Sequence, residues 1–239
     1  MSEPEGILGA ICEYFDTNKP LKGKKALVTS GPTHEPIDPV RYLSNRSSGK
    51  QGHAIAAALN QIGAETTLVT GPSNEPDPMG VNVKRVENAR EMLAACQESL
   101  PVDIAVCAAA VTDWHPSETY KQKIKKNGNT PSVQLTKNPD ILKELAKKCG
   151  HRPDLVIGFA AETGDVVEKA TPKLSDKGCD WILANDVSKG TKTFGGDENT
   201  IHFISADLVE TWPKMSKTKV GWFLADRIAK KFEETLKND

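Results

Sequence analysis

The stretch Ile104-Ala105-Val106-Cys107-Ala108-Ala109-Ala110 is apolar at every position and ends in three small residues. A strand with one face in water alternates polar and apolar side chains, whereas an uninterrupted apolar run is typical of a strand buried on both faces. A second strand is predicted at 24–30, where Ala-Leu-Val follows two lysines and the run stops at Gly31-Pro32. The sequence therefore predicts a sheet that is covered on both sides.

Further strands and helices alternate around this stretch. Strands are predicted at 65–70, 81–86, 132–136, 155–160, 181–184 and 200–205, and helices at 48–62, 88–99, 138–148, 166–178 and 217–236. This alternation indicates a three-layer α/β fold with a mostly parallel central sheet. Ligands of such sheets bind beyond the carboxyl ends of the strands, so the candidate loops are those after Ser30, Ala110, Thr136, Ala160 and Ala184.

The charge balance and composition exclude several classes of partner. The 239 residues include 31 basic and 32 acidic side chains, a net charge of −1, so we expect no overall attraction to nucleic acid or to anionic lipid. No apolar run reaches the roughly 18 residues of a membrane span, and the acidic beginning of the chain is unlike a signal peptide. The five cysteines are scattered and form no C-x-x-C pair, as expected of reduced thiols in a cytoplasmic protein.

The first long loop combines glycines with polar groups at the start of a predicted helix. Ser47, Gly49 and Gly52 allow backbone N–H groups and a hydroxyl to meet an anion where the helix dipole favours negative charge. The same residues also suit a capped helix whose glycines permit close packing. Spacing alone does not decide between a phosphate site and a structural turn.

Four other features have two interpretations each. Asp113 follows the apolar run and offers a carboxylate to a hydroxyl, an amide or a metal, but loop aspartates are also common turn and cap residues. The lysines of Lys121–Lys126 suit either a solvated surface or a flap that closes over a triphosphate. Phe159 can stack on a base or simply pack. Lys173 and Lys177 are four residues apart on one face of a predicted helix. They form either a phosphate clamp or an ordinary solvated surface.

Several common sites are excluded by the sequence. Pro32 and Thr33 follow Gly31, so the dinucleotide pattern G-x-G-x-x-G is missing, and Ser44 stands where the Walker pattern needs glycine. The five histidines show no zinc-binding spacing. A G-x-S-x-G elbow is also missing, which leaves a hydrolase triad without support.

Taken together, seven motifs in order closely resemble the phosphopantothenoylcysteine synthetase family (phosphopantothenate–cysteine ligases) of the bacterial, CTP-using type. They are Gly31-Pro32-Thr33-His34-Glu35-Pro36-Ile37-Asp38-Pro39-Val40-Arg41, Asn45-Arg46-Ser47-Ser48-Gly49-Lys50, Ala109-Ala110-Val111-Thr112-Asp113, Lys123-Ile124-Lys125-Lys126, Lys137-Asn138-Pro139-Asp140-Ile141, Gly158-Phe159-Ala160-Ala161-Glu162-Thr163 and Ala184-Asn185-Asp186-Val187. The resemblance extends from Lys24 to Glu234 and implies a Rossmann-like three-layer sandwich.

The resemblance also implies a domain organisation and a reaction. Residues 1–22 resemble the hinge that follows a flavin-dependent decarboxylase in bifunctional bacterial proteins, and 23–239 the synthetase domain, so no flavin is expected in this chain. The family joins 4′-phosphopantothenate to cysteine in coenzyme A synthesis. The acid attacks the α-phosphate of CTP to give an acyl-cytidylate and pyrophosphate, and the cysteine amine then displaces CMP. Mg²⁺ is expected with the triphosphate, and no protein ligand for it is assigned.

By position, the family's roles fall on particular residues of this chain. Lys123 is expected against the triphosphate in the first step, and Asn45 is expected to hold the acyl group in the second, because an amide both donates and accepts hydrogen bonds. Arg41 resembles an arginine that the neighbouring subunit contributes, which implies a homodimer.

The resemblance assigns the remaining site residues to binding. Ala109, Ala110 and Asp113 are expected to line the junction between the two substrates. The phosphate-binding loop corresponds to Gly31, Ser47, Gly49 and Gly52. Nucleotide contacts correspond to Pro139, Asp140, Ile141, Leu142, Phe159, Lys173, Lys177 and Asn185.

Two other functions stay open on the residues alone. One is an NAD(P)-binding Rossmann oxidoreductase, against which the missing glycine fingerprint stands. The other is a non-catalytic nucleotide-binding domain, which only a measurement of turnover separates from an enzyme.

Overall fold

A sheet of eight strands forms the centre of the computed structural model, which describes residue 4 and residues 19–125, 132–147, 150–191, 193 and 195–238. Six strands are parallel: β1 (Lys25–Ser30), β4 (Glu65–Thr70), β5 (Asn82–Arg85), β6 (Ile104–Cys107), β9 (Leu155–Glu162) and β10 (Trp181–Asp186). Two antiparallel strands extend one edge, β12 (His202–Ile204) and β13 (Val209–Thr211).

The order of the strands creates a crevice between β1 and β6. Across the sheet the order is β13-β12-β10-β9-β6-β1-β4-β5, so the chain builds outward from β1 to β5 and then restarts on the other side with β6. The helices that next follow β1 and β6 in the chain lie on opposite faces of the sheet, and ligands of doubly wound sheets bind at such a point. The predicted fold class, a Rossmann-like α/β sandwich with a mostly parallel sheet, is confirmed.

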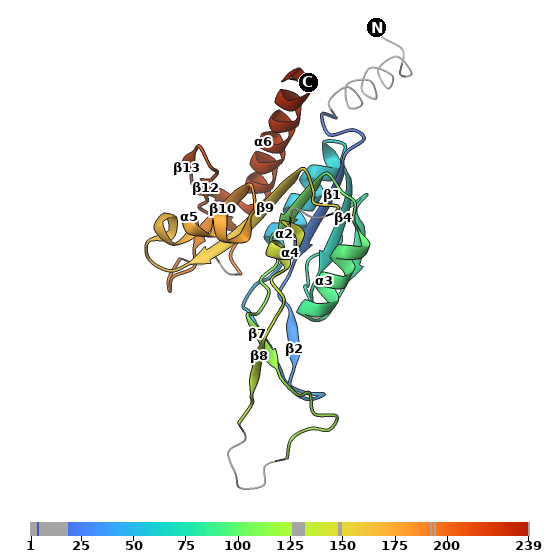
Figure 1. Cartoon of the computed structure of the whole chain (residues 1–239), viewed down its shortest axis with the longest axis vertical. Coiled ribbons are helices and arrows are strands. Elements are labelled where there is room, and N and C mark those ends of the chain that lie inside the picture. The colour runs from blue at the N-terminus through green and yellow to red at the C-terminus, as the bar shows by residue number, and fades with distance from the viewer. Residues whose placement is uncertain are drawn as a thin grey trace.

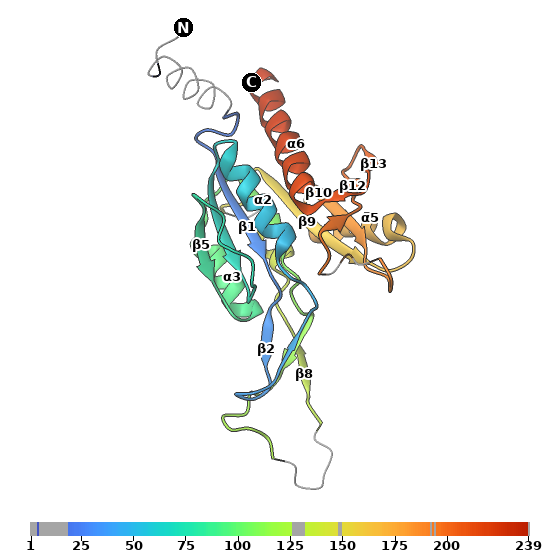
Figure 2. The same cartoon turned by 180° about the vertical axis from the view of Figure 1, so that it is seen from behind.

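Helices cover both faces of the sheet (Figures 1 and 2). On one face, α2 (Lys50–Gln61) packs against α6 (Lys217–Asn238) and on β1 and β4. On the other lie α3 (Ala89–Glu98), α4 (Ile141–Leu145) and α5 (Val166–Lys177). Successive side chains of β1 point to opposite faces of the sheet. Ala26 and Val28 pack in the core beneath α2 and α6, and Leu27 packs in the core on the other face.

Two small hairpins form an arm that projects from the sheet (Figures 1 and 2). One pairs β2 (His34–Pro36) with β3 (Tyr42–Ser44), and the other pairs β7 (Trp114–Pro116) with β8 (Leu135–Lys137). Strands β2 and β7 contact each other. We call His34–Ser44 and the described residues of 114–137 the arm. Of the strands of the arm, only β8 was predicted in part, as the strand at 132–136, which pairs in a hairpin and not in the central sheet. The short pair β11 (Glu198–Asn199) and β14 (Met215–Ser216) was not predicted.

Some predicted boundaries were wrong, for reasons that the hydrogen bonds explain. The apolar run leaves regular pairing after Cys107, although Ala110 still donates to the Gly31 carbonyl oxygen at 2.9 Å. The helix predicted from Asn138 begins at Ile141, because the Asn138 side chain donates to the Thr112 carbonyl oxygen. Asp140 caps α4 instead, accepting from the Lys143 N–H at 3.1 Å.

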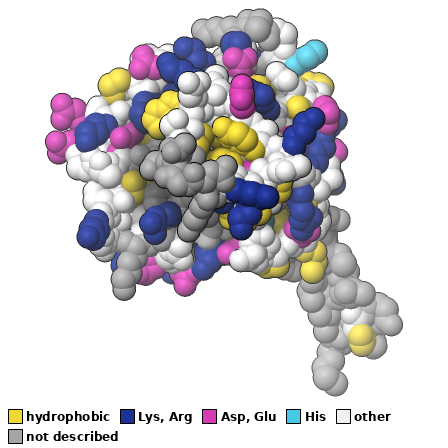
Figure 3. Space-filling view, turned by 90° about the horizontal axis from the view of Figure 1, so that it is seen from below, with side chains coloured by type: hydrophobic (Ala, Val, Ile, Leu, Met, Phe, Trp, Pro, Cys, Tyr) yellow, Lys and Arg dark blue, Asp and Glu magenta, His cyan; other side chains and the backbone are white. Residues whose placement is uncertain are grey.

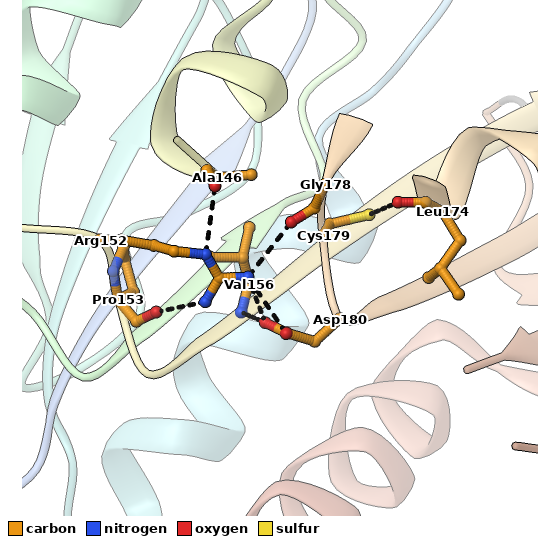
Figure 4. A network of polar contacts seen from close by, with 8 residues as sticks. All are labelled: Ala146, Arg152, Pro153, Val156, Leu174, Gly178, Cys179 and Asp180. Carbon is orange, nitrogen blue, oxygen red and sulfur yellow. Dashed lines mark hydrogen bonds and ion pairs between the residues drawn. The ribbon is translucent and has the colours of Figure 1, made fainter. Parts of the chain in front are cut away.

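At the amino edge of the sheet, Arg152 joins three segments (Figure 4). Its guanidinium donates to the carbonyl oxygen of Ala146, beyond α4, at 3.1 Å, to that of Gly178, beyond α5, at 3.2 Å, and to both oxygens of Asp180. Asp180 also accepts from the Val156 N–H at 2.7 Å. This network fixes the carboxyl ends of α4 and α5.

Of the predicted linker at 1–22, the part up to residue 18 lies outside the described residues, apart from residue 4. Leu21 is fully buried in the core, and its N–H donates to the Ile62 carbonyl oxygen at 3.1 Å. The domain boundary itself stays a prediction. Within the described part of the chain, no helix is both long and apolar enough to cross a membrane.

Candidate active site

Two connected hollows open at the carboxyl ends of the parallel strands. The larger has a volume of about 660 Å³ and the smaller one of about 100 Å³. Ala109, Ala110, Phe159 and Ala161 line both, so they form the junction between the hollows. A nucleoside or a pantothenate-sized molecule fits the larger hollow, and a group the size of a phosphate fits the smaller.

The smaller hollow lies at the amino end of α2. Ser47, Gly49 and Gly52 line it, and the helix N-cap is Gly49, in the left-handed region at φ 85°. No side chain of the described residues caps this helix, so N–H groups of its first turn are available to an anion. Of the two interpretations of this loop, the uncapped end favours phosphate binding.

Close packing explains why glycine stands at these positions. A Cβ at Gly52 would lie 2.4 Å from the Ser30 Oγ, and one at Gly49 would lie 2.7 Å from the Ser73 Oγ. Gly31 does not line either hollow as the described residues define them. The φ of Gly31 is 75°, and a Cβ there would lie 2.9 Å from the Gly71 carbonyl oxygen. Glycine is therefore needed at position 31 to let the two backbone segments pack closely.

A buried polar pair supports the phosphate loop from behind. The Ser30 hydroxyl donates to the Gly49 carbonyl oxygen at 2.8 Å, and the Nδ1 of the buried His53 lies 3.0 Å from the same oxygen. These contacts hold the loop in the conformation that points its N–H groups at the hollow.

Asn45 lies at the junction of the hollows. Its Nδ2 donates to the Ala110 carbonyl oxygen at 2.8 Å, and its side chain lines the larger hollow. The Ala109 N–H donates to the Thr29 Oγ1 at 3.2 Å, which fixes this backbone. Asp113 is exposed on the same wall, and its carboxylate has no side-chain partner among the described residues.

The far wall of the larger hollow comes from α4, α5 and β9. It includes Pro139, Asp140, Ile141, Leu142, Phe159, Lys173 and Lys177. Lys177 pairs with Asp140, and the Lys173 ammonium lies 2.5 Å from Glu162, so both lysines are already neutralised by carboxylates. Neither interpretation of these lysines, a phosphate clamp or solvated charge, describes this arrangement fully. Asn185 lies on the wall of the smaller hollow.

Arg41 and Lys123 lie on the arm and line neither hollow as the described residues define them. The buried Asp38 carboxylate accepts from the Arg41 Nε at 3.0 Å and from the Ile124 N–H at 3.1 Å. The Arg41 guanidinium beside Asp38, together with these backbone bonds, holds the pKa of that carboxyl well below its usual range. The structure therefore places Arg41 beside the segment of Lys123 and apart from Asn45.

Lys217 is buried on the wall of the smaller hollow and was not predicted as a site residue. Lys50, in the same wall, was noted only as part of a motif, and its ammonium lies 2.5 Å from Asp197. One signal for Lys217 was available, because a lysine in the first turn of a helix opposes the helix dipole. Such a break of a local rule is expected mainly at functional sites.

The face on the side of the arm carries mixed charge. In Figure 3, Lys and Arg side chains are interspersed with Asp and Glu side chains on this face. Among the described residues, no group of three or more His, Cys, Asp or Glu side chains could hold a metal ion. Cys96, Cys107 and Cys179 are free thiols, and burial raises the pKa of Cys96 to about 12.

Comparisons with known proteins give a consistent result. The family model described as "DNA/pantothenate metabolism flavoprotein C-terminal domain" matches residues 21–232. The coenzyme A biosynthesis bifunctional protein CoaBC of Haemophilus influenzae is 42% identical over 237 residues, which is 99% of this chain but 59% of that protein. The chain thus spans about three fifths of this curated relative.

Two solved structures are similar over most of the chain. A crystal structure of the C-terminal domain of CoaBC has a TM-score of 0.73 at 38% identity, covering 92% of this chain and 100% of that one. A DNA/pantothenate metabolism flavoprotein from Streptococcus pneumoniae has a TM-score of 0.72 at 25% identity, covering 86% of this chain and 98% of that one.

Proposed function

The chain belongs to the family of DNA/pantothenate metabolism flavoprotein C-terminal domains, and we propose that it joins 4′-phosphopantothenate to cysteine with CTP. The observation that carries this proposal is the pair of connected hollows at the strand ends. A nucleoside-sized space meets a phosphate-sized space at Ala109 and Ala110, beside an amide side chain. A ligase that activates an acid with a nucleotide needs this combination.

The reaction has two steps. A carboxylate oxygen of phosphopantothenate attacks the α-phosphorus of CTP, the bond to the β-phosphate breaks, and pyrophosphate leaves. The cysteine amine then attacks the acyl carbon, the bond between this carbon and the phosphate oxygen breaks, and CMP leaves, while the amine proton passes to solvent. Activation is needed because a free carboxylate is a poor electrophile.

Asn45 serves the second step in this proposal. Its Nδ2 already donates to the Ala110 carbonyl oxygen at 2.8 Å, which fixes the amide at the junction where the acyl group is transferred. A fixed neutral donor stabilises the oxyanion that develops on the acyl carbonyl. Phe159, which lines both hollows, offers a ring face to the nucleoside.

Mg²⁺ enters with the triphosphate in this proposal. Asp113 contributes an unpaired carboxylate to the wall of the larger hollow, and hard oxygen donors are what this ion prefers. Mg²⁺ commonly binds through substrate phosphates and water, which would supply the rest of its coordination. When bound, the ion would neutralise charge on the leaving pyrophosphate.

We propose that the arm acts on the site of a second copy of the chain. Arg41 and Lys123 lie away from the hollows of their own chain, and the arm exposes the apolar side chains of Val40, Tyr42 and Trp114. Exposed apolar groups gathered on a projection favour an interface. In a symmetric dimer, each arm would then deliver its cations to the partner's hollow.

Mixing two inactive variants tests this arrangement. Asn45→Asp disables the site of its own chain, and Arg41→Gln disables the arm. In a mixed dimer, one of the two sites combines a normal Asn45 with a normal arm from the partner. Random exchange of equal amounts makes about half of the dimers mixed, so about a quarter of the wild-type turnover should return. Arg41 acting within its own chain would give no restoration, and light scattering of the same mixture measures the dimer.

The relatives' names suggest the wider setting. CoaBC is called bifunctional, and this chain matches about three fifths of it, so we propose that a decarboxylase unit accompanies the synthetase in the native protein. We also propose that the reaction takes place in the cytoplasm, where its small-molecule substrates are available. The proposed decarboxylase unit and the proposed location do not affect the proposed ligase reaction.

A nucleotide panel with product identification tests the activity. With CTP, phosphopantothenate, cysteine and Mg²⁺ present, pyrophosphate and CMP are expected, and omission of phosphopantothenate should stop their release. Equal turnover with ATP would remove the CTP assignment but keep the ligase. A non-catalytic domain gives no release, and stabilisation against heat by NADH but not by CTP would favour an oxidoreductase.

A further inference from the structure

Lys217 is a buried lysine that faces the smaller hollow. It is the first residue of α6, and only 8% of its surface is exposed. Its Nζ donates to the Thr193 carbonyl oxygen at 3.0 Å, and among the described residues the ammonium has no other hydrogen-bond partner. Two of its three N–H donors are therefore available to a ligand.

Among the described residues, the lining of this hollow contains two lysines and no carboxylate. Lys50 and Lys217 both line it, while Asp197 pairs with Lys50 at 2.5 Å. The partial positive charge at the amino end of α2 points into the same space. Burial, and then the neighbouring Lys50, lower the pKa of Lys217 by more than the nearby carboxylates of Asp197 and Glu75 raise it.

From this arrangement we infer that Lys217 binds a phosphate group of a substrate, as the side-chain partner of the N–H groups at the start of α2. The inference rests on the proposed ligase function and adds a binding residue to it. A tetrahedral anion suits the site because its oxygens can accept from the backbone N–H groups and from the ammonium at once. The volume of about 100 Å³ suits a group the size of a phosphate.

The phosphate has two possible sources, which share this chemistry. It is either the phosphomonoester of phosphopantothenate or part of the triphosphate of CTP. Each source has a matched compound without phosphate, pantothenate for the first and cytidine for the second. Comparing these four ligands identifies the source.

Acylation of the wild-type protein tests the inference without altering the fold. Acetic anhydride labels lysines, and the modified peptides are quantified by mass spectrometry at ligand saturation. A phosphorylated ligand should reduce labelling of Lys217 several-fold, while its matched compound without phosphate does not. Lys219, an exposed lysine on the same helix, is the internal control and should be labelled equally throughout.

Substitution gives the second measurement. Lys217→Met should weaken binding of the same phosphorylated ligand about tenfold or more in calorimetry, Lys217→Arg less so, and Lys219→Met not at all. Thermal unfolding of each unliganded variant separates lost binding from lost folding. If none of the four ligands changes the labelling of Lys217 in a protein that catalyses the ligase reaction, the inference is overturned. If the wild-type protein does not catalyse the reaction at all, the proposed function is refuted instead.

Discussion

The amino and carboxyl edges of the central sheet differ in how completely their polar groups are paired. At the amino edge, Asp103 and Asp180 each accept from a basic side chain and from a backbone N–H. At the carboxyl edge, Lys217 has spare donors and the amino end of α2 has no side-chain cap among the described residues. Satisfied polar groups stabilise one edge, and unsatisfied groups at the other edge are available for ligands.

Changes at the carboxyl edge and the arm should therefore affect turnover and leave stability nearly unchanged. The largest effect is expected for Lys123→Gln, because the exposed ammonium makes no ion pair among the described residues and is proposed to stabilise the leaving pyrophosphate. Loss of one such contact should slow the first step roughly 10²-fold or more, or about 2.7 kcal/mol. Pyrophosphate release in a single turnover measures this rate. Lys121→Gln, an exposed neighbour, is the control, and an equal loss there would contradict a specific role.

Asn45→Asp should separate the two steps. The variant should bind both substrates and release pyrophosphate, but amide formation should slow by roughly 10²-fold, because a second anion would lie beside the acyl group. Quenched-flow analysis with cysteine added last measures the decay of the acyl-cytidylate. If the intermediate forms slowly and then decays at the wild-type rate, the assignment of Asn45 to the second step is wrong.

The fold was accessible from the sequence because its signals are local. The runs at 104–110 and 65–70 predicted strands, and a helix was predicted from residue 88, where the Glu91 N–H donates to the Asn88 side chain at 3.0 Å and α3 begins. In the arm only β8 was predicted in part, as a strand at 132–136, whereas β2, β3 and β7 were missed. All four strands have three residues each and mostly exposed or half-buried side chains. Short strands of this kind show no hydrophobic alternation.

The candidate site was accessible only in part. The motifs named Asn45, Ala109 and Phe159, and the structure brings these residues to one crevice. Lys217 was missed because its place beside Thr193 depends on tertiary packing of α6 against α2. The position of Lys123 on the arm also depends on packing, through the contact between Asp38 and the Ile124 N–H. Spacing along the chain does not encode such long-range contacts.

At the amino edge, Arg152→Met should lower stability and leave turnover at low temperature unchanged. The guanidinium holds the ends of α4 and α5 through carbonyl oxygens and Asp180, and its loss leaves Asp180 with the Val156 N–H. Because both charged groups are partly exposed, at 19% and 36%, we expect a loss of about 1–3 kcal/mol. Urea unfolding measures it. Arg85→Met, which breaks an exposed pair with Asp77, should cost less, and an equal cost would contradict the importance of the network.

The smallest effect should be the pH dependence contributed by Asp103. Burial alone would raise the pKa of this carboxyl, but bonds from the Lys25 N–H and the Lys24 ammonium outweigh burial and lower it. A folded pKa below the unfolded value of about 3.9 adds stability that is complete above that value and is lost as the pH falls through the folded pKa. The difference in unfolding free energy between wild type and Asp103→Asn should therefore be constant near neutrality, at about 1 kcal/mol because the pair is partly exposed, and shrink in acid. Urea titrations from pH 7 downward measure this difference. If the difference in unfolding free energy grew as the pH fell, the pKa of Asp103 would be raised by folding and not lowered. The bonds at the amino edge would then not favour the ionised carboxylate.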